Sequence, residues 1–472
     1  MNVRRVRVTE VSHVQPAEKT TNNNEPRDHH AASINLSPFD TMFLALPPIQ
    51  RLFIYHDDGG AGKDDLPPYP ALARTLRASL AATLALFTPL AGKLTARSGS
   101  DSDDLVVDCS PEAVRPGVRF VEAEYSGDML KLARDVEHDA DAFLQLVPEL
   151  DVRRLPAPVL AVQVTRSAGA GAVAVGVSMH HAVADGKSLW QFMRAWAATS
   201  RDGGGEEVLL PTPTFERADI LRHPKAQPAA RQFARLLAPD MPAMNTLPEP
   251  DWTRQSRRTY LVAADQILSL KRRISQAAAK DQPPPTSYVA IASVLWTSIA
   301  RAAKSPDQDD ATDDDDAYYF LFPADCRRRL RPPLDPAFFG NCVKFCCARA
   351  TTHDLCRHDA DDALARAAAA VGRAIREQVE EEDPLGDVDR WAETIQGIPR
   401  ERLAQQGSSH RFMAYEVDFG WGEPSRVEIV SVFNETMAML VGARDGAVQV
   451  SVALPRDRMD GFQDSFVSQL SA

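Results

Sequence analysis

The chain has 472 residues, of which 44% are hydrophobic and 25% are charged. These values are typical of a soluble globular protein and differ from those of disordered or fibrous chains. The formal net charge is -12, from 53 Lys and Arg against 65 Asp and Glu, so we expect neither nucleic acid nor an anionic membrane as a partner. An anionic small molecule is not excluded, because one pocket of an acidic protein can be locally basic.

Length and cysteine content narrow the class further. A chain this long favours two domains over a single core. Its six cysteines are too few for a disulfide scaffold, and the five between residues 326 and 356 lack CxxC spacing, so we expect buried thiols and no metal site. No apolar segment of signal-peptide or membrane-spanning length is found, which makes the cytoplasm the expected location.

The first half of the chain contains predicted strands and helices without strict alternation. Residues 15–32 are polar and predict a loop. Residues 71–88 place Leu76, Leu80 and Leu84 at helical spacing, and Pro89 ends this predicted helix. Runs of apolar and β-branched residues predict strands at 105–107, 118–121, 159–164 and 172–179.

A glycine- and proline-rich stretch begins near residue 201 and predicts a crossover between domains. We therefore divide the chain into an N-terminal domain (1–200), a linker (201–255) and a C-terminal domain (256–472). The acidic run at 309–316 indicates a solvated loop, since its spacing fits no EF-hand. Apolar periodicity predicts helices at 287–303 and 360–382, and strands at 428–433, 437–441 and 447–453.

Two adjacent histidines, His180 and His181, follow the predicted strand at 172–179, and a helix is expected after Gly186 with Ser188 as its cap. A strand end is a rigid platform for a catalytic group. A neutral imidazole could take a proton from a substrate hydroxyl that attacks an acyl carbonyl. Asp185 could anchor this loop through a hydrogen bond or an arginine, or it could orient the imidazole as a triad carboxylate does.

The alternative interpretation is that the two histidines are hydrogen-bonded core residues without a catalytic role. Residue types alone favour this alternative. Nucleophilic catalysis has less support, because the chain has no Gly-x-Ser-x-Gly elbow and no cysteine in an evident activating context. An acyl transfer by this chain would then proceed directly in a ternary complex, without an acyl-enzyme.

Several segments together resemble the plant BAHD acyltransferases. The string His181-Ala182-Val183-Ala184-Asp185-Gly186 is shared with condensation domains and chloramphenicol acetyltransferase-like enzymes, but Asp418-Phe419-Gly420-Trp421-Gly422 matches the DFGWG signature of the BAHD family. Similarity covers roughly residues 36–470. Further segments resemble the family at 36–40 (LSPFD), 86–94 (LFTPLAGKL), 325–330 (DCRRRL) and 338–342 (FFGNC).

The resemblance implies a mixed α/β fold with two chloramphenicol acetyltransferase-like domains, joined by a crossover loop and separated by a channel. It singles out His181 as the general base and implies a structural role for Asp185. Asp418 would support the fold or coenzyme binding, and a role as second catalytic acid is an alternative. Thr286 and Ser287, at a helix start, match the place where the family contacts coenzyme A, and exposed helix N–H groups suit such a contact.

The FFGNC segment resembles the YFGNC segment of the clade that acylates anthocyanin, flavonoid and phenolic glucosides, with Phe338 in place of the tyrosine. This resemblance implies malonyl transfer from malonyl-CoA to a sugar hydroxyl, with acyl-CoA as co-substrate and no permanently bound cofactor. A malonyl carboxylate needs a cation, and Lys187 and Arg194 are the candidates. Both are ordinary surface charges in the alternative interpretation.

Two other functions stay open on the sequence. The donor could be a hydroxycinnamoyl-CoA such as coumaroyl-CoA, with the same enzyme class and the same base. The chain could instead be a catalytically inactive relative that binds a metabolite, although both motifs are intact. We expect a monomer that binds a small-molecule acceptor and an acyl-CoA donor.

Overall fold

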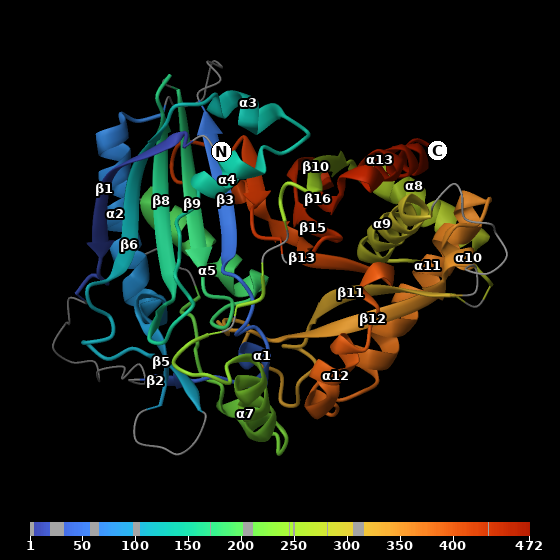
Figure 1. Cartoon of the computed structure of the whole chain (residues 1–472), viewed down its shortest axis with the longest axis horizontal. Helices are drawn as coiled ribbons and strands as arrows, with labels where there is room; N and C mark the ends of the chain where they lie inside the picture. Colours follow the sequence, from blue (N-terminus) through green and yellow to red (C-terminus); the bar gives the residue numbers. More distant parts are fainter. Residues whose placement is uncertain are drawn as a thin grey trace.

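The computed structural model describes residues 4–18, 33–56, 66–97, 104–169, 171–201, 211–244, 246–248, 251–280, 282–304, 316–432 and 434–472. The loop predicted at 15–32, the start of the linker and the acidic run at 309–316 lie largely outside these ranges. Two six-stranded sheets form the two halves of the molecule, each with its own helices and core (Figure 1).

The sheet of the first half has the strand order β1-β6-β8-β9-β3-β14. Its strands are β1 (Val6–Val14), β3 (Ile49–His56), β6 (Val118–Tyr125), β8 (Leu160–Ser167), β9 (Ala172–Met179) and β14 (Arg426–Ile429). β9 lies between β8 and β3 and is buried along its whole length, which explains why it reads as a continuous apolar run rather than an alternating one. β14 comes from the last part of the chain and pairs antiparallel with β3.

Helices cover both faces of this first sheet. The helices α2 (Tyr69–Leu86) and α5 (Gly186–Arg201) pack against each other over one face, with the main core between them and the strands. The short helices α3 (Met129–Arg134) and α4 (Ala140–Gln145) pack on the opposite face in a smaller core. Only six residues separate the end of β9 from the start of α5, so the connecting loop is held between two buried elements.

The sheet of the second half has the order β10-β16-β15-β13-β11-β12. Four helices pack together on it, and α9 at their centre is buried from Val289 to Ala300. The strands are β10 (Gln255–Val262), β11 (Ala317–Asp325), β12 (Val343–Thr351), β13 (Leu403–Met413), β15 (Met437–Gly442) and β16 (Val448–Pro455). The helices are α8 (Ala264–Ala277), α9 (Ser287–Ala303), α11 (Ala360–Ile375) and α13 (Arg456–Ser471).

Smaller elements join the halves. A four-stranded sheet runs β2 (Ser33–Asn35), β5 (Leu105–Asp108), β4 (Lys93–Ala96) and β7 (Ala157–Pro158). The short helix α1 (Pro38–Thr41) packs on α7 (Ala226–Leu237). The remaining short helices are α6 (Ala218–Leu221), α10 (Thr352–Leu355) and α12 (Trp391–Gln396).

Most elements expected from the sequence lie within two residues of their observed bounds, and the differences have local causes. The predicted helix 360–382 ends earlier, because α11 passes into a π-helical turn at Arg376–Glu380. Helix α7 is absent from the expectations because Pro228 reads as a breaker, whereas it occupies the first turn, where its missing N–H costs no helical bond. None of the helices in the described ranges is long and apolar enough to cross a bilayer.

Candidate active site

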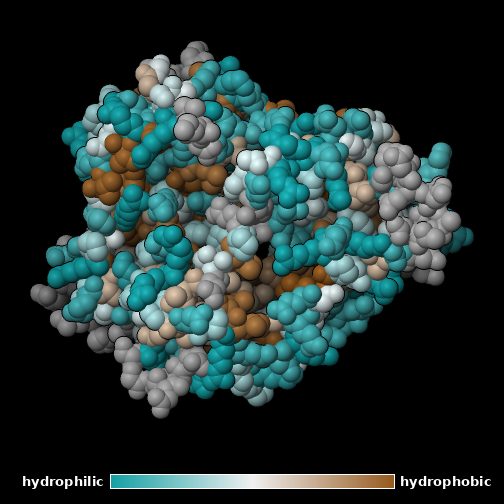
Figure 2. All heavy atoms as spheres, in the orientation of Figure 1, coloured by the Kyte–Doolittle hydropathy of each residue, from teal (hydrophilic) through white to brown (hydrophobic). Residues whose placement is uncertain are grey.

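The loop between β9 and α5 carries His181 into the region where the two halves meet. The imidazole of His181 stacks on Phe43, with ring centroids 4.2 Å apart and an interplanar angle of 4°. Asn341 Nδ2 donates a hydrogen bond of 3.0 Å to the carbonyl oxygen of His181. Both the ring and the backbone are therefore positioned by other segments, one from each half of the chain. Figure 2 shows that the surface is hollowed between the halves and that hydrophobic residues gather there.

His181 is neutral near pH 7. Burial lowers its pKa to about 4, and the positive charge of Arg51 acts in the same direction. Nδ1 of His181 is buried, which leaves Nε2 as the nitrogen that can face a substrate. A neutral imidazole held in this way can accept a proton.

His180 has a different role. It is buried, and burial lowers its pKa to about 3. Its Nδ1 accepts a hydrogen bond of 3.2 Å from the backbone N–H of Ala182, so its ring supports the turn that presents His181.

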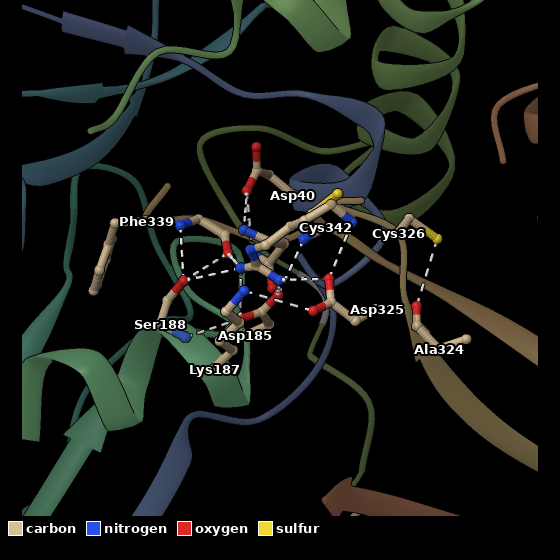
Figure 3. A network of polar contacts seen from close by, with 12 residues as sticks. Asp40, Asp185, Lys187, Ser188, Ala324, Asp325, Cys326, Phe339 and Cys342 are labelled. Carbon is tan, nitrogen blue, oxygen red and sulfur yellow. Dashed lines mark hydrogen bonds and ion pairs between the residues drawn. The ribbon is translucent and has the colours of Figure 1, made fainter. Parts of the chain in front are cut away.

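Asp185 is buried and lies close to Ser188 and Cys342 (Figure 3). Its carboxylate is bound to Arg327, which comes from the second half of the chain. Arg327 Nη1 lies 2.8 Å from Asp185 Oδ2, and Nη2 donates to Oδ1 at 3.0 Å. The backbone N–H groups of Ser188 and Cys342 donate to the same carboxylate at 3.0 and 3.1 Å. Burial alone would raise the pKa of Asp185, but Arg327 and these donors hold it below its ordinary value.

The expectation that Ser188 caps the following helix is wrong. Helix α5 begins at Gly186, and Asp185 caps it by accepting from the N–H of Ser188. The hydroxyl of Ser188 instead bonds to both the N–H and the carbonyl of Gly340, each at 2.9 Å. Ser188 therefore ties the first turn of α5 to the FFGNC segment.

A second buried ion pair lies beside the first. Arg217 Nε lies 3.4 Å from Asp40 Oδ2, and Asp40 Oδ1 accepts from the backbone N–H of Asn341 at 3.1 Å. The ring of Phe338 is 5.1 Å from the guanidinium of Arg217 and 5.5 Å from that of Arg327, within cation–π range. We call Asp40, Asp185, Arg217, Arg327 and the segment Phe338–Cys342 the central clamp.

The central clamp explains the glycine of the FFGNC segment. A Cβ at Gly340 would clash with the guanidinium of Arg217. The clamp therefore requires this glycine, and it joins α1, the linker, the start of α5 and the second half into one buried polar network. It fixes the backbone on both sides of His181.

The expected coenzyme contact lies at the start of α9. Thr286 Oγ1 accepts from the N–H of Val289 at 3.2 Å and so caps the helix. The hydroxyl of Tyr288 donates to Gln406 Oε1 on β13 at 2.8 Å. At the other end of β13, Phe412 packs on Gly186, where a Cβ would lie 2.7 Å from the ring. Strand β13 therefore contacts both the first turn of α9, through Tyr288, and the start of α5, through Phe412.

Lys187 and Arg194 both have carboxylate partners. Lys187 Nζ lies 3.7 Å from Asp325 Oδ2, and Arg194 Nη2 lies 3.5 Å from Glu416 Oε2. Their side chains are 42% and 47% exposed. Each cation is thus already paired and in contact with water.

Asp418 accepts hydrogen bonds within its own loop. Its Oδ1 accepts from the backbone N–H groups of Gly420, Trp421 and Gly422 at 2.8, 3.1 and 2.9 Å. The loop docks on the end of α5, where Ser200 Oγ donates to the carbonyl of Phe419 at 3.1 Å. A helix of 16 residues spans about 24 Å, so this loop and the His181 loop lie at opposite ends of α5.

The cysteines are free thiols. Within the described ranges, no group of three or more His, Cys, Asp or Glu side chains is placed to hold a metal ion. Burial raises the pKa of Cys326 and of Cys346 to about 12, so neither is a thiolate near pH 7.

Sequence reasoning missed Phe43 and the partners in the central clamp. Asp40, Arg327 and Asn341 lie inside the segments that carry the family resemblance, but their positions in the sequence give no indication of what they bind. Phe43 lies just past one of these segments and reads as an ordinary core aromatic. Their roles depend on contacts between residues more than 130 positions apart.

Comparisons with known proteins bear on the family and the fold of the chain. Residues 4–469 match the model of the Transferase family. A malonyl-coenzyme:anthocyanin 5-O-glucoside-6'''-O-malonyltransferase of Salvia splendens is 28% identical over 457 residues, covering 93% of this chain and 92% of that protein. A coumaroyl-CoA:anthocyanidin 3-O-glucoside-6''-O-coumaroyltransferase 2 of Arabidopsis thaliana is 25% identical over 474 residues, covering 96% and 95%.

The fold is shared with a solved enzyme. The crystal structure of vinorine synthase superposes with a TM-score of 0.70 at 19% identity, over 98% of each chain. The expected mixed α/β fold with two chloramphenicol acetyltransferase-like domains is confirmed. Given the family match over nearly the whole chain, the protein belongs to the Transferase family of BAHD enzymes and is an acyltransferase.

Proposed function

We propose that this acyltransferase moves a malonyl group from malonyl-CoA to a sugar hydroxyl of a flavonoid, anthocyanin or phenolic glucoside, with His181 as the general base. The observation that carries the proposal is the neutral imidazole of His181, stacked on Phe43 and held through its backbone by Asn341. The malonyltransferase of Salvia splendens among the relatives supports the donor and the class of acceptor.

The reaction proceeds by direct transfer. The acceptor hydroxyl gives its proton to Nε2 of His181 while its oxygen attacks the thioester carbonyl. A C–O bond forms and the C–S bond breaks, and the proton then passes from the imidazolium to the sulfur to release the coenzyme as a free thiol. The raised pKa of the Cys326 and Cys346 thiols supports a path without an acyl-enzyme.

The other predicted residues take supporting roles. Thr286 and Ser287 contact the coenzyme, and the start of the 17-residue helix α9 offers N–H donors there. Asp185 holds the loop through Arg327, and Asp418 holds its own loop rather than acting as a second acid. Lys187 and Arg194, suggested by the sequence for the malonyl carboxylate, would have to leave Asp325 and Glu416 to bind it. The enzyme acts as a monomer in the cytoplasm.

A second candidate uses a different donor. The coumaroyltransferase of Arabidopsis thaliana covers as much of the chain as the malonyltransferase does, at similar identity. A coumaroyl group would use the same base but would need an apolar acyl pocket instead of a cation. Mass spectrometry of the products formed from equimolar malonyl-CoA and coumaroyl-CoA, with one anthocyanin glucoside, separates the two donors.

The His181→Ala variant tests the base. Turnover falls on the order of 100- to 10,000-fold, the range of a general base, while coenzyme binding measured by calorimetry stays close to wild type. His223→Asn is the matched control, because His223 pairs with Asp383 on the surface. A wild-type rate for His181→Ala overturns the assignment of the base. An inactive wild-type chain that still binds acyl-CoA or glucosides would support the metabolite-binding alternative.

A further inference from the structure

Arg51 is a buried cation with no carboxylate partner among the described residues. It lies on β3 and is 3% exposed. Its Nη1 donates to the carbonyl of Gln50 at 2.8 Å, while its Nε is buried without a hydrogen-bond partner. Burying a charge is costly unless it is paired. An arginine left in this state indicates that an anion completes the site.

The position of Arg51 in the sheet brings it close to the base. Arg51 pairs with Val177 on β9, four residues before His181. Alternation along β3 puts Arg51 on the same face as Ile49 and Phe53, which share the core beneath α5 with Val177. The side chain therefore points to the face of the sheet that the His181 loop and α5 cover.

Two further observations place the guanidinium beside the site. Its charge lowers the pKa of His181, so it lies within electrostatic reach of the imidazole. Trp190 on α5 packs edge-on against Phe53 at 5.8 Å, and its Nε1 is likewise buried without a hydrogen-bond partner. Burial lowers the pKa of Arg51 to about 9, which leaves it charged at cytosolic pH.

Three other cations near the His181 loop, Arg327, Arg217 and Lys187, already have carboxylate partners. Arg327 and Arg217 are bound to the carboxylates of the central clamp. Lys187 is half-exposed and paired with Asp325. The carboxylate of a malonyl thioester is separated from the reacting carbonyl by a single methylene, so its cation must lie next to the base.

We propose that Arg51 determines donor specificity by binding the carboxylate of malonyl-CoA; this inference rests on the proposed function. The buried guanidinium supplies a charge-assisted hydrogen bond to the carboxylate. It also orients the thioester carbonyl towards the acceptor hydroxyl at His181. Donors without this carboxylate, such as acetyl-CoA, gain no binding energy from the guanidinium of Arg51.

The test compares malonyl-CoA with acetyl-CoA in the full-length enzyme. Arg51→Gln lowers kcat/KM for malonyl-CoA on the order of 100-fold, the cost of removing one partner of a buried charge pair, and changes kcat/KM for acetyl-CoA by less than about threefold. Arg51→Lys restores part of the malonyl activity because it keeps the charge. Arg166→Gln is the matched control: it removes a strand arginine of the same sheet that pairs with Glu124 on the surface.

The outcomes separate this inference from the proposed function. If Arg51→Gln leaves kcat/KM for malonyl-CoA unchanged, or lowers kcat/KM for malonyl-CoA and acetyl-CoA equally, Arg51 does not bind the carboxylate. The proposed malonyl transfer is not affected by that result. A selective loss of malonyl transfer in Lys187→Ala instead would assign the carboxylate to Lys187. If the wild-type enzyme rejects malonyl-CoA but uses coumaroyl-CoA, both the proposed donor and this role of Arg51 fail. Thermal unfolding of each variant identifies any variant that does not fold. In that case the wild-type enzyme is tested instead, by comparing its affinity for malonyl-CoA with its affinity for the neutral methyl ester of malonyl-CoA. Weaker binding of the ester is expected if Arg51 binds the carboxylate.

Discussion

The two motif loops at the ends of α5 use an aspartate in opposite ways. Asp185 accepts from Arg327 and Cys342 of the second half as well as from Ser188 next to it. Asp418 accepts three hydrogen bonds from N–H groups of its own loop. One aspartate connects distant parts of the chain and the other shapes a turn. The first motif therefore depends on residues from distant parts of the chain, whereas the second depends mainly on its own backbone.

The largest effect expected from this comparison is that of Asp185→Asn. The substitution keeps the shape but removes the buried anionic partner of Arg327 and leaves its guanidinium only the half-exposed carboxylate of Asp325. We expect this loss to cost about 3–5 kcal/mol of unfolding free energy. Urea unfolding measures this loss, and activity falls with it because the His181 loop loses its anchor. The double variant Asp185→Leu with Arg327→Met recovers much of the stability. A single variant as stable as wild type would contradict the anchoring role.

The two histidines of the first loop, whose folded-state pKa values are lowered, predict an acid-sensitive fold. The pKa of His181 is about 4 and that of His180 about 3 in the folded protein, whereas an unfolded histidine titrates near 6.5. Between these values the unfolded chain binds more protons, so stability falls as the pH drops from about 6.5 towards 4. Asp185, whose folded pKa is also lowered, adds to this loss at the acid end.

Two measurements check the pH prediction. Urea unfolding from pH 7 to 4 shows the loss of stability, and it is less steep in His180→Asn. The acid limb of kcat/KM lies well below pH 6.5, because the free enzyme keeps a neutral base there. An acid limb centred near 6.5 would mean that the imidazole of His181 is solvated rather than buried.

Gly186→Ala is expected to have a smaller effect on the same loop. A Cβ at this position would lie 2.7 Å from the ring of Phe412, and overpacking of this kind costs about 1–3 kcal/mol. The strain falls between β13 and the start of α5, so kcat is expected to fall as well. Phe412→Leu in the same chain relieves the contact and restores activity. If the double variant were no better than the single one, the glycine would be needed for another reason.

Asp418→Ala has the smallest expected effect on catalysis. The loop loses one side-chain acceptor for three N–H groups, which costs about 1–2 kcal/mol of stability. The kcat of the folded fraction at 25 °C stays within about threefold of wild type, because the loop lies at the far end of α5. A drop of kcat comparable with that of His181→Ala would restore Asp418 as a second catalytic acid.

The elements that were predicted from sequence depend on local patterns, whereas others, such as β1, β3 and α13, were not predicted. The continuous apolar run of β9 and the helical spacing within α2 and α9 each follow from burial on one face or on all sides. Helix α7 was missed because the position of Pro228 within a helix could not be known before the helix itself was.

The candidate site was predictable only in part. His181 could be named because a strand end and a second motif point to it. The role of Asp185 was left open by the residues alone, because its partner Arg327 is 142 positions away and no periodicity connects them. Arg51 could not be found at all, since a lone arginine in the sequence is interpreted as a surface charge. Its significance comes from the burial that only the assembled sheet produces.

The pairing of β14 with β3 also bears on how the protein is made. Residues 49–56 are synthesised long before residues 426–429, with which they pair. The edge of β3 in the first sheet therefore stays unpaired until nearly the whole chain has been synthesised. Exposed edges of this kind recruit other strands. Nascent chains therefore have a long interval in which this edge is vulnerable to mispairing, and a fragment that stops before residue 426 would keep it permanently.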